Sequence, residues 1–360
     1  MQLNVLTLHG DGIGTEVTRE AVKVLEKVAS KFGHGLKLSE GLLGGIAIHK
    51  TGGPFPDETA RLALDADATL MGAVGLPEFD NVPPEKRPEK GLLGIRKVLG
   101  VYANLRPVKA YPALIESSPL KNHIVEGVDM IIVRELNGGI YYGQPRGIQG
   151  SGEEERGTNT MTYTRAEIAR ITRMAFHLAR NRKKKVTSVD KSNVLETSQL
   201  WRKVVNEVAP EFPDVELEHL LVDNCAMQLI LRPKQFDVVV MENMFGDILS
   251  DEGAVLSGSI GMLPSASIGE KKASGAWVGL YEPVHGSAPD IAGQNKANPL
   301  GAIGSVAAML EYSFGLVQEA AAVNRAVEDV LNSGNVTADL KPKNTPATCS
   351  QVGDAVANAI

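Results

Sequence analysis

The sequence contains little cysteine, few aromatic residues and no long apolar run. Cys225 and Cys349 are the two cysteines of the 360-residue chain, and they lie far apart without the spacing of a metal site. We therefore expect free thiols in a reducing compartment. No run of about 18 apolar residues predicts a membrane-spanning helix, and no signal-peptide pattern opens the chain. These features favour a cytoplasmic protein without a membrane partner.

An excess of positive charge is also missing. The formal net charge is −6 at pH 7, which gives no general case for a nucleic acid or an anionic membrane as partner. The basic run Arg180–Lys185 ends an expected helix, where positive charge is favourable. Hydrophobic residues make up 43% of the chain and glycines number 37. This composition suits an α/β protein with many tight turns between strands and helices.

Strand and helix patterns alternate in the first part of the chain. Residues 3–8 alternate as a strand does, and residues 16–32 have helical periodicity. Further strands are expected at 36–40 and 68–73, and this order indicates a parallel sheet. A second α/β stretch begins at Arg165. We expect the two ends of the chain to contribute strands to one sheet.

The turn Gly10-Asp-Gly-Ile-Gly14 invites comparison with a dinucleotide-binding loop, because it follows a strand and opens a helix. The Rossmann fingerprint requires glycine at the next position, where this chain has Thr15. Asp11 also places a negative side chain where a pyrophosphate would lie. A structural turn near an active site is the favoured interpretation, and a dinucleotide loop is the alternative.

Asp247 and Asp251 follow an apolar strand expected at 236–241. Four residues apart on a helix, they project from one face with Cβ atoms about 5–6 Å apart. Two carboxylates that close repel one another unless positive charge lies nearby. Mg²⁺ or Mn²⁺ is a natural partner for such oxygen ligands, and Asp223 could complete the site. From the spacing alone, a solvated helix face is the more common explanation.

Three arginines, Arg96, Arg106 and Arg134, are candidates for binding an acidic substrate. Arg106 and Arg134 end expected strands, and ligands of open α/β sheets bind at such ends. Arginine binds carboxylates with two parallel hydrogen bonds. Singly, each could be an ordinary surface arginine. Together they favour a substrate with more than one carboxylate.

Tyr141 and Lys191 are candidate groups for proton transfer. Neither is informative alone, but near a metal ion and arginines the phenolate of Tyr141 would be favoured and its pKa lowered. The loop His285–Gly293 combines small residues with a histidine and an aspartate, which suits a bound nucleotide. A plain glycine-rich loop is the alternative for this segment.

Two irregular segments interrupt the α/β pattern. The stretch 79–91 is rich in proline and charge, so we expect a loop, and long loops in compact domains are more often functional than idle. Residues 136–163 contain several glycines and are expected to form an exposed β-hairpin or arm. Such an arm could contact a second subunit.

Six motifs occur in order along the chain: Leu-His-Gly-Asp-Gly-Ile-Gly, Ala-Asn-Leu-Arg-Pro, Val-Arg-Glu-Leu-Asn-Gly-Gly-Ile-Tyr-Tyr-Gly, Ser-Val-Asp-Lys-Ser-Asn-Val-Leu, Phe-Gly-Asp-Ile-Leu-Ser-Asp and His-Gly-Ser-Ala-Pro-Asp-Ile-Ala-Gly. In this the chain closely resembles the isopropylmalate and isocitrate dehydrogenases, a family of β-decarboxylating dehydrogenases. The resemblance covers essentially the whole chain.

The resemblance implies an α/β fold with two domains, not a Rossmann fold. A mixed parallel sheet would be flanked by helices, and a β-arm at about 136–163 would serve dimerisation. Residues 1–100 plus 253–360 would form a discontinuous cofactor-binding domain. Residues 101–252 would form the central domain for substrate, metal and dimer contacts. The protein would be a homodimer with shared active sites.

The resemblance also implies a reaction. This is the NAD-dependent oxidative decarboxylation of (2R,3S)-3-isopropylmalate to 4-methyl-2-oxopentanoate and CO₂ in leucine biosynthesis. Tyr141 would protonate the enol, and Lys191 would assist deprotonation of the alcohol. Substrate contacts would come from Arg96, Arg106, Arg134, Asp223, Leu92, Leu93 and Glu89. Mg²⁺ or Mn²⁺ would bind Asp247 and Asp251, with Asp223 and Lys191 supplied by the partner subunit. NAD would contact Leu76, Glu89, Asn193, Glu282, His285, Gly286, Ser287, Ala288, Pro289, Asp290, Ile291 and Asn298.

The substrate side chain and the cofactor type also have sequence signals. Leu92 and Leu93 lie one helical turn before Arg96, and this apolar pair suits an isopropyl group. Asp290 suits the ribose of NAD and would repel the 2′-phosphate of NADP. The same chemistry on D-malate, tartrate or homoisocitrate is the alternative. A regulatory subunit without activity is a further one, and the complete set of site residues argues against it.

The chain departs from the usual family pattern at a few positions. None of them removes a catalytic group. Leu76 borders the expected nicotinamide loop, so cofactor affinity is the property that these departures most concern. The positions are His9, Thr15, Leu76, Asn137 and Tyr142.

Overall fold

The computed structural model describes residues 1–83, 86–272 and 275–360. The chain divides into two compact units. Unit 1 comprises Met1–Val101, Tyr111–Pro119 and Ser257–Ile360, and unit 2 comprises Tyr102–Ala110 and Leu120–Leu256. The segment Tyr111–Pro119 therefore belongs with unit 1, although its place in the sequence lies inside the expected central domain. Part of the expected loop at 79–91 lies outside the described residues, at 84–85.

The strands of unit 1 lie in the order β2-β1-β3-β12-β11. Four of them run parallel, and β11 is antiparallel to β12. Leu6 and Leu8 of the first strand join one core cluster, as the alternation along a strand requires. The bounds are β1 (Gln2–Gly10), β2 (Gly35–Glu40), β3 (Ala68–Ala73), β11 (Pro264–Lys271) and β12 (Trp277–Pro283).

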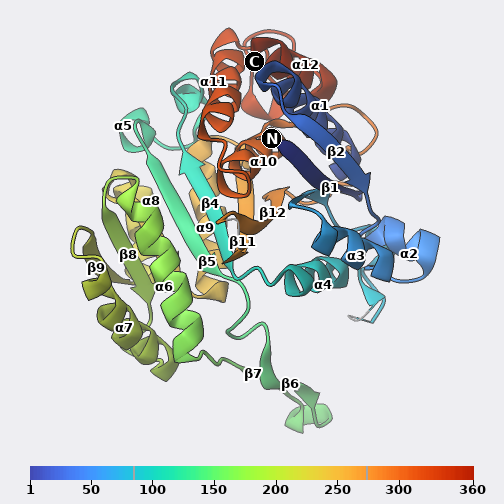
Figure 1. Cartoon of the computed structure of the whole chain (residues 1–360). Coiled ribbons are helices and arrows are strands. Elements are labelled where there is room, and N and C mark those ends of the chain that lie inside the picture. The colour runs from blue at the N-terminus through green and yellow to red at the C-terminus, as the bar shows by residue number, and fades with distance from the viewer. Residues whose placement is uncertain (84–85, 273–274) are drawn as a thin grey trace. The chain divides into compact units, whose positions relative to one another are not determined.

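Helices of unit 1 form two groups (Figure 1). α1, α10, α11 and α12 pack on one another, and α1 and α10 also pack on the strands. α3 and α4 pack together beside the core cluster of Leu6 and Leu8, to which they contribute Ala63 and Ile95. The bounds are α1 (Gly14–Phe32), α2 (Gly45–Thr51), α3 (Asp57–Asp65), α4 (Glu89–Leu99), α10 (Leu300–Tyr312), α11 (Val317–Ser333) and α12 (Cys349–Ala359).

The strands of unit 2 lie in the order β4-β5-β10-β8-β9. All run parallel except β4, which is antiparallel to β5. Because β5, β8 and β10 are parallel, their carboxyl ends meet at one edge of the sheet, where ligands of such sheets usually bind. The bounds are β4 (Ala103–Lys109), β5 (Asp129–Glu135), β8 (Lys185–Asp190), β9 (Glu216–Leu221) and β10 (Val238–Met241).

Two helix pairs cover this sheet. α6 and α7 pack together and contact β8, and α8 and α9 pack together, with α9 against β4, β5 and β10. Thr164 begins α6 with a capping box, in which its side chain accepts from the backbone N–H of Glu167. Asp223 lies in the first turn of α8, directly after β9 ends at Leu221. The bounds are α5 (Asn122–Val125), α6 (Arg165–Arg180), α7 (Glu196–Val208), α8 (Val222–Leu231) and α9 (Asn243–Ala254).

A two-stranded hairpin extends from unit 2. It consists of β6 (Gly143–Gln149) antiparallel to β7 (Arg156–Thr160) and lies apart from the packed helices of the unit (Figure 1). Most of its residues are exposed, and Ile148 is 75% exposed. The expected hairpin is therefore present.

The basic run at the end of α6 is paired with acids of the same unit. Arg180 binds Asp214 with two nitrogens, and Arg182 binds both Asp129 and Asp237. These ion pairs give the basic run a structural role, because they join the end of α6 to neighbouring segments. Among the described residues, no helix is both long enough and apolar enough to cross a membrane.

Candidate active site

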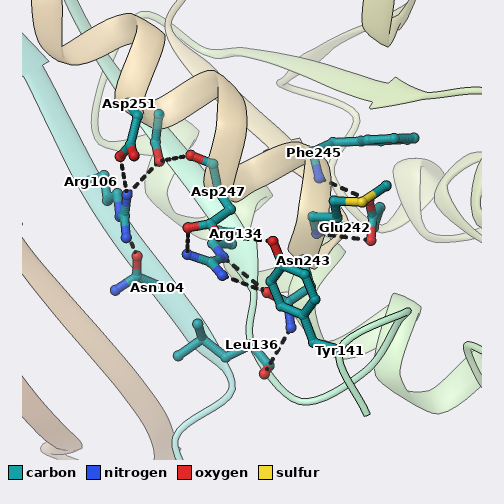
Figure 2. Close-up of polar contacts among 12 residues, drawn as sticks. Asn104, Arg106, Arg134, Leu136, Tyr141, Glu242, Asn243, Phe245, Asp247 and Asp251 are labelled. Carbon is teal, nitrogen blue, oxygen red and sulfur yellow. Dashed lines mark hydrogen bonds and ion pairs between the residues drawn. The ribbon is translucent and has the colours of Figure 1, made fainter. Parts of the chain in front are cut away.

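Helix α9 presents Asp247 and Asp251 on one face (Figure 2). The helix begins directly after β10, where the carboxylate of Glu242 accepts from the backbone N–H groups of Met244 (3.1 Å) and Phe245 (2.8 Å). Such a cap satisfies amides that would otherwise lack partners in the first turn. The expected helical i, i+4 pair is therefore present, and its starting point is fixed by a buried acid.

Arg134 ends β5 and points at α9. Its Nε and Nη2 donate to the side-chain oxygen of Asn243 at 3.0 and 2.8 Å, and its Nη1 donates to Asp247. Asn243 in turn donates to the carbonyls of Leu136 (3.1 Å) and Gly138 (3.2 Å). A guanidinium that is only 6% exposed needs such acceptors, because it cannot lose its charge. The asparagine thus holds Arg134 against the first aspartate.

Arg106 donates to the second aspartate, Asp251, just as Arg134 donates to Asp247. It lies on β4, where its Nε donates to Asn104 (2.8 Å) and its Nη1 donates to Ser250 (2.6 Å) and Asp251 (3.1 Å). The two carboxylates of α9 therefore each face an arginine from a different strand (Figure 2). This arrangement offsets their mutual repulsion.

Tyr141, in the loop after β5, contacts the carboxylate of Asp247. Its hydroxyl donates to Asp247 at 2.9 Å. Burial, together with this hydrogen bond and the charge of Asp247, raises the pKa of Tyr141 to about 12, while Arg134 acts in the opposite direction. The expected lowering was tied to a metal ion beside the phenol, whereas burial and the carboxylate of Asp247 set the direction of the shift in this structure. Tyr141 is a phenol, and therefore a proton donor, at neutral pH.

The loop that carries Tyr141 is held by buried acids and a second tyrosine. Glu135 accepts from the backbone N–H of Gly138 at 2.7 Å, and burial raises the pKa of this carboxyl. The hydroxyl of Tyr163 accepts from the N–H of Asn243 at 3.0 Å. A Cβ at Gly139 would lie 2.5 Å from that hydroxyl, so the close approach requires glycine.

Lys191 and Asp223 pair with each other. Their Nζ and Oδ1 atoms are 2.5 Å apart, and this contact lowers the pKa of Asp223. The preceding residue, Asp190, is 1% exposed and accepts from Arg202 with both oxygens. This ion pair anchors the end of β8 directly before Lys191. Asn193 lies in the following turn and is exposed.

In unit 1, several of the residues expected to bind substrate or cofactor lie on α4 and β12, and others lie in the loop after β12. Arg96 of α4 donates to Glu282 of β12 at 2.9 Å. Its Nε is buried and has no hydrogen-bond partner among the residues that the structure describes. Leu92 packs against the core cluster of Leu6 and Leu8, and Leu93 on the same helix is half-buried. Arg96 therefore retains a donor that an anion could use.

The loop after β12 combines buried and exposed groups. His285 is 9% exposed, and burial lowers its pKa, so its ring is neutral near pH 7. Asn298 donates to Asp339 at 3.0 Å. Ser287 is buried, whereas Gly286, Pro289 and Asp290 are exposed and Ala288 and Ile291 are half-buried.

The donor set on α9 fits a hard divalent cation. Two carboxylates supply oxygen ligands from one face, and their side chains are 37% exposed at Asp247 and 63% at Asp251. Within the described ranges, no group of three or more His, Cys, Asp or Glu is arranged to hold a metal ion. A cation bound here would therefore need further oxygen ligands from a substrate, water or a second chain.

Three residues that hold the arginines of this site in place were not predicted from the sequence. Asn243 and Asn104 orient the two arginines, and Ser250 shares Arg106 with Asp251. Ser250 and Asp251 are neighbours on α9, and Asn243 opens that helix. Asn104 and Ser250 lie inside the quoted motifs, and Asn243 lies two residues before one of them, which was the available signal.

Comparisons with known proteins cover nearly the whole chain. A model of the isocitrate/isopropylmalate dehydrogenase family matches residues 4–356. The 3-isopropylmalate dehydrogenase of Geobacillus kaustophilus is 62% identical over 338 residues, which is 94% of this chain and 90% of that protein. The protein of the same name from Halalkalibacterium halodurans is 55% identical, with 100% and 98% covered. A crystal structure of isocitrate dehydrogenase from Methylococcus capsulatus has a TM-score of 0.86 at 33% identity, with 99% of each chain covered.

Replacing Asn243 tests how the arginine is held. Asn243→Ala leaves the buried Arg134 without its paired acceptor, so we expect a loss of about 2–3 kcal/mol in urea unfolding. Asn122→Ala is the matched control, because Asn122 is an exposed asparagine of the same unit. The control should lie within about 0.5 kcal/mol of the wild type. Equal losses in both variants would contradict the role of Asn243.

Proposed function

The chain belongs to the isocitrate/isopropylmalate dehydrogenase family, and we propose that it catalyses the NAD-dependent oxidative decarboxylation of 3-isopropylmalate. The observation that carries this proposal is the cluster on α9, where Arg106, Arg134 and Tyr141 converge on two carboxylates. The high identity to 3-isopropylmalate dehydrogenases over almost the full length favours that substrate within the family.

Substrate carboxylates would replace aspartates as partners of the arginines. Arg106 and Arg134 already hold carboxylates in this structure, so their geometry suits an acid. Arg96 would add a third contact through its free Nε donor. Once the substrate takes over the guanidinium groups, Asp247 and Asp251 become available to a cation.

The reaction requires two proton transfers and a hydride transfer. The hydroxyl carbon passes a hydride to NAD⁺, and Lys191 assists removal of the hydroxyl proton, which yields a β-keto acid. Loss of CO₂ leaves an enol, and Tyr141 protonates its carbon to give 4-methyl-2-oxopentanoate. The raised pKa of Tyr141 supports this role, since the phenol is protonated at neutral pH. Bound to Asp247 and Asp251, Mg²⁺ or Mn²⁺ would polarise the ketone and stabilise the enolate charge.

NAD is the proposed cofactor, and all but one of the residues proposed to bind it belong to unit 1, the exception being Asn193 of unit 2. The segment His285–Ile291 would hold the adenosine part, with Asp290 on the ribose hydroxyls and Asn298 beside the base. Asp290 is exposed and therefore free to accept such hydrogen bonds. Leu76, Glu89, Glu282 and Asn193 would lie toward the nicotinamide part. The neutral ring of His285 suits contact with an uncharged base.

The active protein is proposed to be a homodimer in which each site uses both chains. Several apolar side chains near Lys191 in the sequence or on the packed helices α8 and α9 are exposed: Val194, Met227, Leu231 and Ile248 are each 55–60% exposed. Exposed apolar side chains that form a patch are typical of interaction surfaces. Asp223 and Lys191 of the partner subunit would complete the set around Asp247 and Asp251, and the hairpin of β6 and β7 would add dimer contacts.

The reaction would be a step of leucine biosynthesis in the cytoplasm. Its product, 4-methyl-2-oxopentanoate, has the carbon skeleton of leucine. Cys225 and Cys349 are both buried as free thiols, which fits a reducing compartment. A related 2-hydroxy diacid such as D-malate, tartrate or homoisocitrate is the second candidate substrate.

Turnover with purified protein tests the proposal directly. We expect NADH production from 3-isopropylmalate and NAD with Mg²⁺, and none after EDTA treatment. Re-addition of Mg²⁺ or Mn²⁺ should restore activity. Comparison of kcat/KM with D-malate, tartrate and homoisocitrate decides between substrates. Absence of turnover with 3-isopropylmalate, or a higher kcat/KM for another acid, would refute the assignment.

Substrate preference should depend on Leu93. Leu93→Ser removes apolar contact with an isopropyl group, a contact worth about 1.5–3 kcal/mol, so the preference over D-malate should fall about tenfold or more. Leu99→Ala is the control, because Leu99 lies on the same helix and packs against the core cluster. It should lower thermal stability and leave the preference unchanged. An unchanged preference in Leu93→Ser would show that the isopropyl group binds elsewhere.

Shared sites predict complementation between two inactive variants. Asp251→Asn weakens metal binding and Lys191→Ala removes the proton-transfer group, so each homodimer should be nearly inactive. In a mixed dimer, one site would receive only wild-type groups. Co-expression should therefore give about a quarter of wild-type activity, since half the dimers are mixed and each has one intact site. Activity that stays at the level of the single variants would show that each chain supplies its own lysine.

A further inference from the structure

The carboxylate of Asp11 is buried among backbone amides of two other segments. Asp11 is 3% exposed and lies in the turn between β1 and α1. Its Oδ2 accepts from the N–H groups of Gly45 (2.8 Å) and Gly75 (2.9 Å), and its Oδ1 accepts from Ile46 (2.8 Å). Its own N–H donates to the carbonyl of Ala73 at 2.7 Å. One side chain thereby joins its own turn to α2 and to the segment after β3.

The same turn is in backbone contact with the loop after β12. The N–H of Ile13 donates to the carbonyl of Ser287 at 2.8 Å. A Cβ on Gly12 would lie 2.1 Å from that carbonyl oxygen, and Gly12 has a positive φ of +55°. Only glycine permits this approach. The turn therefore lies between the segment at Gly75 and the segment at Ser287.

Leu76 is fixed by the same connection. A Cβ on Gly45 would lie 2.5 Å from the Cδ1 atom of Leu76, so the leucine side chain rests on the bare backbone that begins α2. Asp11 holds this backbone and the amide of Gly75, which precedes the leucine. The side chain of Glu89 also approaches Gly75, with Oε1 3.5 Å from an ideal Cβ there.

We propose that Asp11 is a positioning residue for NAD binding. It touches none of the reacting groups, but it fixes Gly75-Leu76 and, through its turn, Ser287, which are the segments assigned to the cofactor. This inference rests on the proposed function, because it concerns the same cofactor. A binding segment that is correctly placed only part of the time lowers the observed affinity by that fraction. Loosening Asp11 should therefore weaken NAD binding and leave the unit 2 site intact.

Asparagine is the informative replacement for Asp11. It keeps the size of the side chain but offers one acceptor oxygen, and its NH₂ group must then face a backbone N–H. With the oxygen toward Gly45 and Gly75, the amide of Ile46 loses its partner; in the flipped orientation the other two amides lose theirs. Asp11→Asn therefore disturbs the connection in either orientation.

The experiment separates cofactor affinity from substrate affinity. For Asp11→Asn we expect about a tenfold increase in the NADH dissociation constant, measured by fluorescence without substrate, and in the KM for NAD. The KM for 3-isopropylmalate and kcat at saturating NAD should stay within about twofold. Glu20→Gln is the matched control, because Glu20 is also a buried acid of unit 1 (4% exposed) and pairs instead with Lys23. The control should change stability only.

A second variant covers the possibility that Asp11→Asn does not fold. Gly45→Ala places a methyl group against the flexible end of Leu76 and 3.3 Å from Asp11, which disturbs the same connection while keeping the carboxylate. It should weaken NADH binding with an unchanged KM for 3-isopropylmalate. Wild-type NADH affinity in a folded variant, or an equal loss for both ligands, would overturn the inference. Absence of turnover in the wild type would instead refute the proposed function.

Discussion

The site in unit 2 depends on pairing between arginines on two strands, β4 and β5, and aspartates on α9. A buried guanidinium cannot be neutralised, so Arg134 requires Asn243 and Asp247. Two aspartates on adjacent helical turns likewise require positive charge, which Arg106 and Arg134 supply. These contacts therefore fix α9 relative to strands β4 and β5. The hydrogen bond from Tyr141 to Asp247 likewise fixes the loop that carries Tyr141. The charges that would bind substrate and metal are thus also those that set the local structure.

Local patterns in the sequence predicted much of this arrangement. Spacing placed Asp247 and Asp251 on one helical face, and Arg134 lies near the end of β5 as expected. The expectation that Arg106 also ends a strand is wrong, because the pairing of β4 with β5 continues to Lys109 and leaves Arg106 in the middle of β4. Pairing between residues more than a hundred positions apart has no local pattern, so the partner of each arginine could not be predicted. The raised pKa of Tyr141 could not be predicted from the sequence either, because it depends on burial and on contact with Asp247, which lies 106 positions away in the chain.

Glycine-rich segments show a different limit of sequence reasoning. The turn Gly10–Gly14 has the composition of a phosphate-binding loop, yet its amides and its carboxylate are used for contacts within unit 1. Glycine permits close approach to any atom, whether it belongs to a phosphate or to a neighbouring backbone. Helix α2 and strand β11 were not predicted, because short segments rich in glycine, alanine and serine lack a clear apolar period.

Charge balance links the proposed substrate to the proposed metal. Arg106, Arg134, Asp247 and Asp251 carry two positive and two negative charges, so the cluster is formally neutral. A dianionic malate alone would bring this cluster to −2, and a divalent cation alone would bring it to +2. Together they restore neutrality, with each acid facing a cation and each arginine facing a carboxylate. Binding of either proposed ligand would therefore favour binding of the other by relieving unpaired charge in a partly buried site.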